Sequence, residues 1–231
     1  MRIHGVIFDK DGTLFDFQAS WGAWTRTILH EESRGDAALA AQIAAALGFN
    51  PERGEFLPDS VMIGHTSAEV AAEILRFLPG EDSTVLLARL DAGAAAAPQQ
   101  PVEGLRDVLD ILSARGLRLG VATNDSEAPA RTHLQEAGVG DFFDFIAGHD
   151  SGHGSKPEPG QLLAFAHGLD LDPAACVMVG DSLHDLHAAR AAGMAAVGVL
   201  TGIVPHDTLA PMADVVLESI LQLPDWLEAR G

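Results

Sequence analysis

The chain has 231 residues, of which 47% are hydrophobic and 20% are charged, and its formal net charge is -19 at pH 7. These proportions are typical of a globular protein with a buried core, and they exclude an intrinsically disordered chain. Nucleic acids and anionic membrane surfaces bind basic faces, so the excess of acidic residues argues against both as partners.

Two further features bear on where the protein works. No uninterrupted apolar stretch approaches the length of a membrane span, and the first residues show no signal-peptide layout, so we expect a cytoplasmic protein. Cys176 is the sole cysteine, which rules out an intrachain disulfide and favours a reducing compartment. Because it lies in an apolar run, we expect a buried and unreactive thiol.

The first expected element is a β-strand over residues 3–8, which ends in Asp9-Lys10-Asp11-Gly12. A spacing of two on an extended chain places the side chains of Asp9 and Asp11 on one face, where they repel each other unless a cation lies nearby. By the same alternation Lys10 should point away from both. We therefore expect a structural role for Lys10, with its stem packed and its ammonium group paired elsewhere.

The pattern of residues 17–98 is helical. Apolar residues recur at helical spacing between residues 21 and 29, and further helices are expected over residues 37–47, 67–77 and 83–97. This segment carries almost no strand signal. It therefore predicts an all-helical insertion.

After a turn signal at residues 98–101, helices and strands alternate. The expected strands are residues 117–122, 143–147, 176–179, 195–200 and 214–217, and the expected helices are residues 104–114, 126–137, 161–167 and 186–192. This alternation predicts an α/β fold whose parallel sheet is covered on both faces and includes the first strand. In such sheets, ligands bind beyond the carboxyl ends of the strands.

Chemically useful side chains follow four of these strands and should meet at one edge of the sheet: Asp9 and Asp11, Thr123 and Asn124, Lys156, and Asp181 with Asp185. Crowded carboxylates suit a hard divalent cation, and Mg²⁺ fits Asp9, Asp11 and Asp181 better than Ca²⁺ or Zn²⁺ does. The Thr123 hydroxyl, the backbone amides near Asn124 and the Lys156 ammonium group suit a phosphate. A nucleophilic carboxylate and a second acid–base carboxylate are then plausible at Asp9 and Asp11.

The segments DKDGTL, Thr123-Asn124, Lys156-Pro157 and GDSLHD, in this order, resemble the four motifs of the haloacid dehalogenase superfamily of phosphatases. The resemblance implies a Rossmann-like core formed by residues 1–16 and 99–231, with a helical cap formed by residues 17–98. The cap would close over the site and present the residues that select the substrate.

The same resemblance implies roles for individual residues. Asp9 would be the nucleophile and Asp11 the general acid/base, Thr123 would bind phosphate, and Lys156 would neutralise the phosphoryl group and the nucleophile. Magnesium would be held by the carboxylates of Asp9 and Asp181 and by the backbone carbonyl of Asp11. Asp185 would orient these ligands rather than touch the metal.

Within the superfamily, several branches can be weighed. Dehalogenases lack a carboxylate at the position of Asp11, and similar phosphonate hydrolases use a cap lysine, which residues 17–98 do not contain. β-Phosphoglucomutases carry an arginine after a Gly-x-Ser segment, and this chain has Ala68 there. The remaining expectation is hydrolysis of a small phosphorylated metabolite, most like the phosphoglycolate phosphatase group.

Two alternatives stay open: a phosphosugar mutase, and a non-catalytic binding module on the same fold. Loss of the nucleophile or the lysine would mark such a module, and this chain retains both Asp9 and Lys156. Among cap residues, His65 beside Gly64 is the best candidate to contact substrate, whereas we expect Trp24 to pack within the cap and Arg26 to be solvated. A monomer and a homodimer are both compatible with the sequence.

Overall fold

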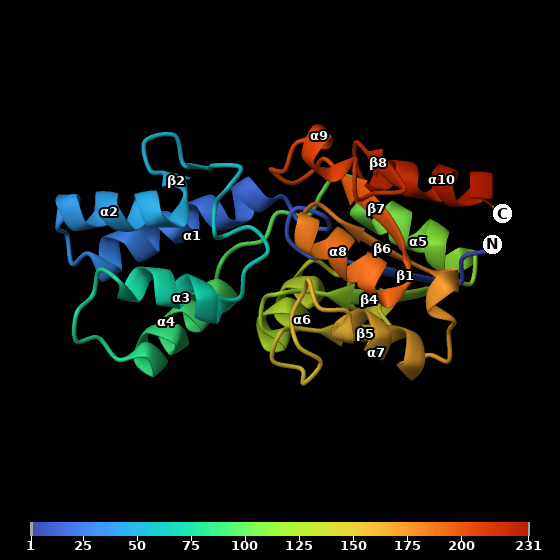
Figure 1. Ribbon diagram of the computed structural model, residues 1–231, viewed down its shortest axis with the longest axis horizontal. Helices are drawn as coiled ribbons and strands as arrows, with labels where there is room; N and C mark the ends of the chain where they lie inside the picture. Colours follow the sequence, from blue (N-terminus) through green and yellow to red (C-terminus); the bar gives the residue numbers. More distant parts are fainter. Residues whose placement is uncertain (1, 231) are drawn as a thin grey trace.

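A six-stranded parallel sheet lies at the centre of the larger part of the protein in the computed structural model, which describes residues 2–230 (Figure 1). The strands are β1 (Gly5–Phe8), β4 (Arg118–Ala122), β5 (Phe145–Ala147), β6 (Cys176–Gly180), β7 (Ala195–Val199) and β8 (Val215–Leu217). Their order in the sheet is β5-β4-β1-β6-β7-β8, and all neighbouring pairs are parallel. Because β1 lies between β4 and β6, the carboxyl ends of these three strands are neighbours.

Helices cover both faces of this sheet. One face packs against α5 (Leu105–Ala114), α6 (Glu127–Glu136) and α10 (Leu223–Arg230), and the other against α7 (Gly160–Gly168), α8 (Leu183–Ala192) and α9 (His206–Leu209). Short 3-10 turns at Gly140–Phe142, Pro173–Ala175 and Ile220–Gln222 complete the connections. Alternation along β1 shows why both faces are apolar: Val6 and Phe8 pack on the first face and Ile7 on the second, all fully buried.

Residues 17–98, between β1 and α5, form a separate helical unit, drawn from blue to green in Figure 1. It consists of α1 (Phe17–Glu32), α2 (Ala37–Leu47), α3 (Ser67–Leu75) and α4 (Ser83–Ala95), with a hairpin of β2 (Phe49–Asn50) and β3 (Glu55–Phe56). Its buried apolar residues, from Phe17 to Ala97, form a cluster of their own. The helices begin at side chains that accept backbone N–H groups: Asp16, Asp36, Thr66 and Asp82.

Two paired segments connect this unit to the sheet. The backbone N–H of Asp16 donates to the carbonyl of Gln100 at 2.8 Å, and that of Val102 donates to Leu14 at 3.0 Å. Phe15 and Pro101 form an antiparallel bridge between these bonds. The chain therefore leaves the sheet and returns to it along the same short ribbon.

The predicted strands and helices are present with ends shifted by a few residues, whereas a short hairpin and two helices were not predicted. The β2–β3 hairpin has strands of two residues, too short to leave a sequence period, and it is held by the Phe49 and Phe56 rings 4.8 Å apart. The unpredicted helices are α9, which has only four residues, and the terminal helix α10. None of the helices within residues 2–230 is both long enough and apolar enough to cross a membrane.

Candidate active site

Three neighbouring strand ends and the helical unit enclose a cavity of about 80 Å³. Asp9 follows β1, Thr123 follows β4 and Asp181 follows β6, and all three side chains line the cavity. Lys156 reaches the same cavity from the loop between β5 and α7. The structure therefore brings these four side chains together, as the sequence led us to expect.

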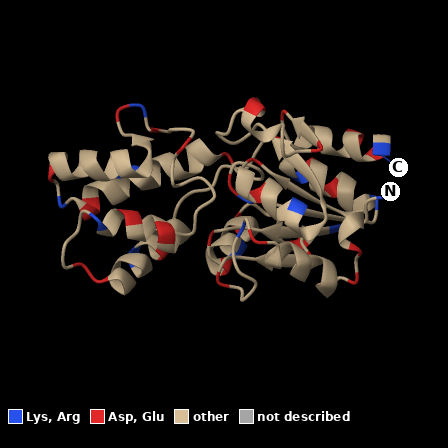
Figure 2. Cartoon of the chain, in the orientation of Figure 1, with Lys and Arg blue, Asp and Glu red and all other residues tan. Residues whose placement is uncertain are grey.

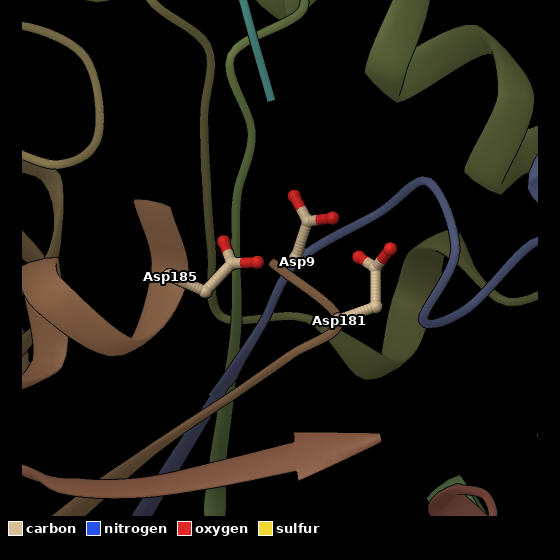
Figure 3. A group of neighbouring side chains, drawn as sticks. All are labelled: Asp9, Asp181 and Asp185. Carbon is tan, nitrogen blue, oxygen red and sulfur yellow. The ribbon is translucent and has the colours of Figure 1, made fainter. Parts of the chain in front are cut away.

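Three carboxylates lie close together at this site (Figure 3), and two of them, Asp9 and Asp181, line the cavity. One oxygen each from Asp9, Asp181 and Asp185 lies within 4.8 Å of the others, and all three residues are buried. Asp9 and Asp181 leave the ends of adjacent strands, whereas Asp185 belongs to the first turn of α8. Buried carboxylates at this separation repel each other, so they need compensating positive charge.

Lys156 supplies part of that charge. Its Nζ lies 2.5 Å from Oδ1 of Asp9 and 2.6 Å from Oδ1 of Asp185. Burial alone would lower the pKa of Lys156, but the two carboxylates outweigh it and raise this pKa, so the ammonium group stays charged. The second oxygen of Asp185 accepts from the backbone N–H and the hydroxyl of Ser182, at 3.0 and 2.7 Å. Both oxygens of Asp185 are thus engaged, which favours a positioning role over metal binding.

The other two carboxylates lack enough positive charge from the protein. Burial, followed by repulsion from Asp185 and Asp11, raises the pKa of Asp9 to about 7 although Lys156 opposes the shift. Burial and the Asp9 charge raise the pKa of Asp181 well above its usual value. Within residues 2–230, no other residue donates a hydrogen bond to the Asp181 carboxylate.

The surroundings of Asp181 fit a small hard cation. Gly12 and Gly202 lie so close to its carboxylate that a Cβ at either position would collide with it. The glycines therefore leave room for the Asp181 carboxylate. The group that could hold a metal ion here consists of carboxylates, and oxygen ligands suit Mg²⁺ in particular. The residues present thus fit the group that the sequence predicts.

The expectation for the direction of Lys10 is wrong. Its side chain is fully buried, but Nζ lies 3.0 Å from Oδ1 of Asp11 and 3.3 Å from Oδ2 of Asp125. Strand alternation does not extend to Lys10 because β1 ends at Phe8 and the chain then turns. In this turn the carbonyl of Lys10 accepts from the backbone N–H groups of Leu14 and Phe15. The buried stem agrees with the prediction, but the ammonium group pairs with Asp11 as well as Asp125, and both carboxylates raise the pKa of Lys10 against the lowering effect of burial. The structural role of Lys10 stays a prediction.

Besides Asp125, two further groups around Lys10 were missed by the sequence reasoning. His133 in α6 brings Nδ1 to 3.2 Å from Lys10 Nζ, and its Nε2 lies 3.2 Å from the carbonyl of Ala94 in α4. Trp21 in α1 donates from Nε1 to Oδ1 of Asp11 at 2.8 Å. For Trp21, the sequence offered the general rule that a buried indole N–H finds a hydrogen-bond acceptor. This rule does not identify Asp11 as that acceptor.

Thr123 and Asn124 both line the cavity, but they differ in which hydrogen-bonding groups remain available to a ligand. The Thr123 hydroxyl accepts from the backbone N–H of Asp125 at 3.1 Å and keeps its own hydrogen to donate. The Asn124 side chain exchanges two hydrogen bonds of 2.8 Å with the backbone of Lys156 and donates to the carbonyl of Gly64 at 2.5 Å. Asn124 therefore holds Lys156 and the helical unit in place, and only its backbone amide remains for a phosphate.

His65 lies where the helical unit meets the sheet and lines the cavity. Its Nδ1 lies 3.2 Å from the carbonyl of Ile63, and its ring packs edge-on against His184 at 5.3 Å. Trp24 also lines the cavity, with its ring 5.0 Å from Trp21. Arg26 is exposed and turns to the carbonyl of Pro51, away from the site.

Comparison with known proteins identifies the family. Residues 3–193 match the model of the haloacid dehalogenase-like hydrolases, and the chain belongs to this family. It is 30% identical over 236 residues to a phosphoglycolate phosphatase of Rhodospirillum rubrum, covering 96% of this chain and 90% of that protein. It is 35% identical over 211 residues to the probable phosphatase IndB of Dickeya dadantii, covering 88% and 84% of the two chains.

A solved structure extends the likeness to the whole fold. The predicted phosphoglycolate phosphatase of Haemophilus somnus superposes with a TM-score of 0.77 at 19% identity and covers 98% of both chains. The predicted superfamily and the predicted α/β fold class are confirmed, and so is the prediction of a phosphoric monoester hydrolase. The catalytic roles of single residues stay predictions.

Proposed function

We propose that this protein is a magnesium-dependent phosphatase that hydrolyses a small phosphomonoester by way of a phosphorylated aspartate. The observation that carries the proposal is the position of Lys156, whose Nζ bridges Asp9 and Asp185 at the cavity that Asp181 and Thr123 also line. A buried ammonium group beside a strand-end carboxylate is what a phosphoryl group and a carboxylate nucleophile both require. The cavity volume of about 80 Å³ supports a small substrate.

Asp9 would form and break the bonds to phosphorus. One of its oxygens faces Lys156, and attack by the carboxylate would join Asp9 to the phosphoryl group as the ester oxygen leaves. Asp11 would give its proton to that leaving oxygen, and would later take a proton from the water that releases phosphate. Thr123 would donate its hydroxyl hydrogen to a phosphoryl oxygen, and Lys156 would neutralise the charge that develops there.

Asp9, Asp181 and the backbone carbonyl of Asp11 would hold Mg²⁺. When bound, the ion would offset the negative charge of the carboxylates and of the phosphoryl oxygens. Asp185 would position Lys156 through their ion pair, and it would position the backbone at Ser182 by accepting its N–H.

We further propose that residues 17–98 act as a cap over a core formed by residues 1–16 and 99–231. The separate apolar cluster of the helical unit and the paired ribbon at Asp16 and Gln100 support this division. A cap in this position excludes water from the site and presents the surface that contacts the leaving group.

Phosphate release from p-nitrophenyl phosphate, with Mg²⁺ and with EDTA, tests the proposed function. We expect turnover only with Mg²⁺, and a fall of at least about three orders of magnitude in the Asp9→Asn variant. Asp141→Asn, which alters an exposed carboxylate far along the chain, is the matched control and should keep wild-type turnover. Undiminished turnover in Asp9→Asn would refute Asp9 as the nucleophile.

A further inference from the structure

The side of the cavity that faces the leaving group is formed by the helical unit and is mainly apolar. Its principal side chains are Phe17, Trp21, Trp24, Met62, Val70 and Leu90. His65 and Ser67 are the polar side chains that this unit adds to the lining. Within residues 2–230, the cavity wall contains no arginine, and Lys156 is its only lysine.

The cations of the helical unit are all engaged elsewhere. Residues 17–98 contain five arginines and no lysine. Arg26 donates to the carbonyl of Pro51, Arg34 pairs with Glu81, Arg53 with Glu55, Arg76 with Glu73, and Arg89 with both Glu32 and Glu81. Figure 2 shows the basic positions of this unit away from its junction with the sheet. No arginine of the unit is therefore placed to meet a substrate.

The core side of the cavity cannot supply the missing charge. Asp9, Asp11, Asp125 and Asp181 line it, and Lys156 is already bonded to two carboxylates. Lys10 is paired with Asp11 and Asp125 and does not line the cavity. A second anionic group on the substrate, whether a carboxylate or another phosphate, would lose its hydration there without gaining an unpaired lysine or an arginine as its partner.

We infer that the leaving group of the natural substrate is an uncharged and mainly apolar alcohol, and that glycolate is a poor one. This inference rests on the proposed phosphatase function. The aromatic and aliphatic lining contacts the carbon skeleton, which buries apolar surface on binding. The His65 imidazole and the Ser67 hydroxyl can hydrogen-bond a polar group such as a hydroxyl on that skeleton.

A matched pair of esters tests the inference. Phosphoglycolate and isobutyl phosphate differ in that two methyl groups replace the carboxylate oxygens, so size is nearly constant while charge changes. With excess Mg²⁺, we expect kcat/KM to be at least about tenfold higher for isobutyl phosphate. Phenyl phosphate and 4-carboxyphenyl phosphate form a second pair, for which we expect the same direction.

A variant that adds the missing charge provides an independent test. Met62 is a partly buried side chain of the cavity wall, and Met62→Lys would place a cation there. We expect Met62→Lys to raise the ratio of kcat/KM for phosphoglycolate over isobutyl phosphate. Met62→Gln, which is polar and uncharged, should leave this ratio near that of the wild type.

The outcomes separate the two proposals. If the wild type hydrolyses phosphoglycolate as well as or better than isobutyl phosphate, the neutral leaving group is refuted while the phosphatase function stands. If neither pair nor p-nitrophenyl phosphate is hydrolysed with Mg²⁺, the phosphatase function is refuted and the leaving-group inference with it. If Met62→Lys and Met62→Gln raise the ratio of kcat/KM for phosphoglycolate over isobutyl phosphate equally, the charge of the cavity wall does not decide which ester is preferred.

Discussion

The indole N–H of Trp21 in α1 donates to the same carboxylate oxygen of Asp11 that Lys10 contacts, at 2.8 Å and 3.0 Å respectively. One donor comes from the helical unit and the other from the loop after β1. The orientation of Asp11 therefore depends on where the helical unit lies relative to the sheet. Since Asp11 is the proposed general acid/base, this contact joins cap position to proton transfer.

Trp21→Phe removes this donor and keeps most of the apolar ring. A hydrogen bond to a charged group is worth about 1.5–3 kcal/mol, so we expect kcat to fall by about tenfold or more with a smaller change in KM. Steady-state kinetics on p-nitrophenyl phosphate measure both constants. Trp24→Phe is the matched control, because Trp24 lines the same cavity with its ring against Trp21. Equal losses of kcat in the two variants would show that packing, not the bond to Asp11, is responsible.

Lys10→Met should destabilise the fold. The substitution keeps the packed stem but leaves Asp11 and Asp125 without their buried cation, which costs about 3–5 kcal/mol in comparable buried pairs. Urea denaturation measures the change in the free energy of unfolding. Adding Asp125→Asn to Lys10→Met should recover part of the loss, since one of the two unpaired charges is removed. A Lys10→Met protein as stable as the wild type would contradict the ion-pair reading.

Stability without metal should fall as the pH rises. The pKa of Asp9 is raised from 3.8 to about 7, so the folded state holds a proton that the unfolded state releases at lower pH. The contribution of Asp9 to the free energy of unfolding is therefore most favourable below about pH 4, and it declines as the pH rises to about 7. Asp181 acts in the same direction. Mg²⁺ binds the ionised carboxylates and should reverse the decline.

Thermal unfolding with EDTA and with Mg²⁺, at about pH 5.5 and about pH 7.5, measures this linkage. We expect Mg²⁺ to raise Tm more at the higher pH, where fewer protons compete for the carboxylates. Asp181→Asn should abolish most of the Mg²⁺ effect at both pH values. An equal Mg²⁺ effect in wild type and Asp181→Asn would place the ion elsewhere.

Cys176 should resist thiol reagents in the folded protein. Its side chain is fully buried in β6, and burial, with a smaller contribution from Asp172, raises the pKa of the thiol to about 11. The thiolate is the reactive form, so little reaction with a disulfide reagent is expected near pH 8. The same thiol should react once the protein is unfolded in guanidinium. Stoichiometric labelling of the native protein within minutes would contradict its burial.

The sequence allowed the core of the site to be predicted because one geometric rule applies to it. Asp9, Thr123 and Asp181 each follow a strand, and parallel strands bring their carboxyl ends to one edge. Lys156 lies in a loop, but the motif order of the superfamily indicated its place. The alternation of apolar residues was likewise sufficient for most helices and strands of the sheet region.

Features that depend on packing between distant elements could not be predicted. The direction of Lys10 was wrong because strand alternation ends where the backbone turns after Phe8. The contacts of Trp21 with Asp11 and of His133 with Ala94 join α1 to the β1 loop and α6 to α4. No periodicity within one element specifies such pairs. Of the arginines of the helical unit, on which the substrate inference depends, only the exposed position of Arg26 was anticipated from the sequence.

The paired ribbon at Phe15 and Pro101 has a consequence for how this enzyme could be rebuilt. Both junctions of the inserted unit lie beside each other, joined by the bonds from Asp16 to Gln100 and from Val102 to Leu14. Two cuts at this one place would release the entire unit, and a foreign cap could be grafted there without breaking the sheet. Chimaeras made in this way would exchange the surface that faces the leaving group, and they would need an N–H donor in place of Trp21 to keep the bond to Asp11.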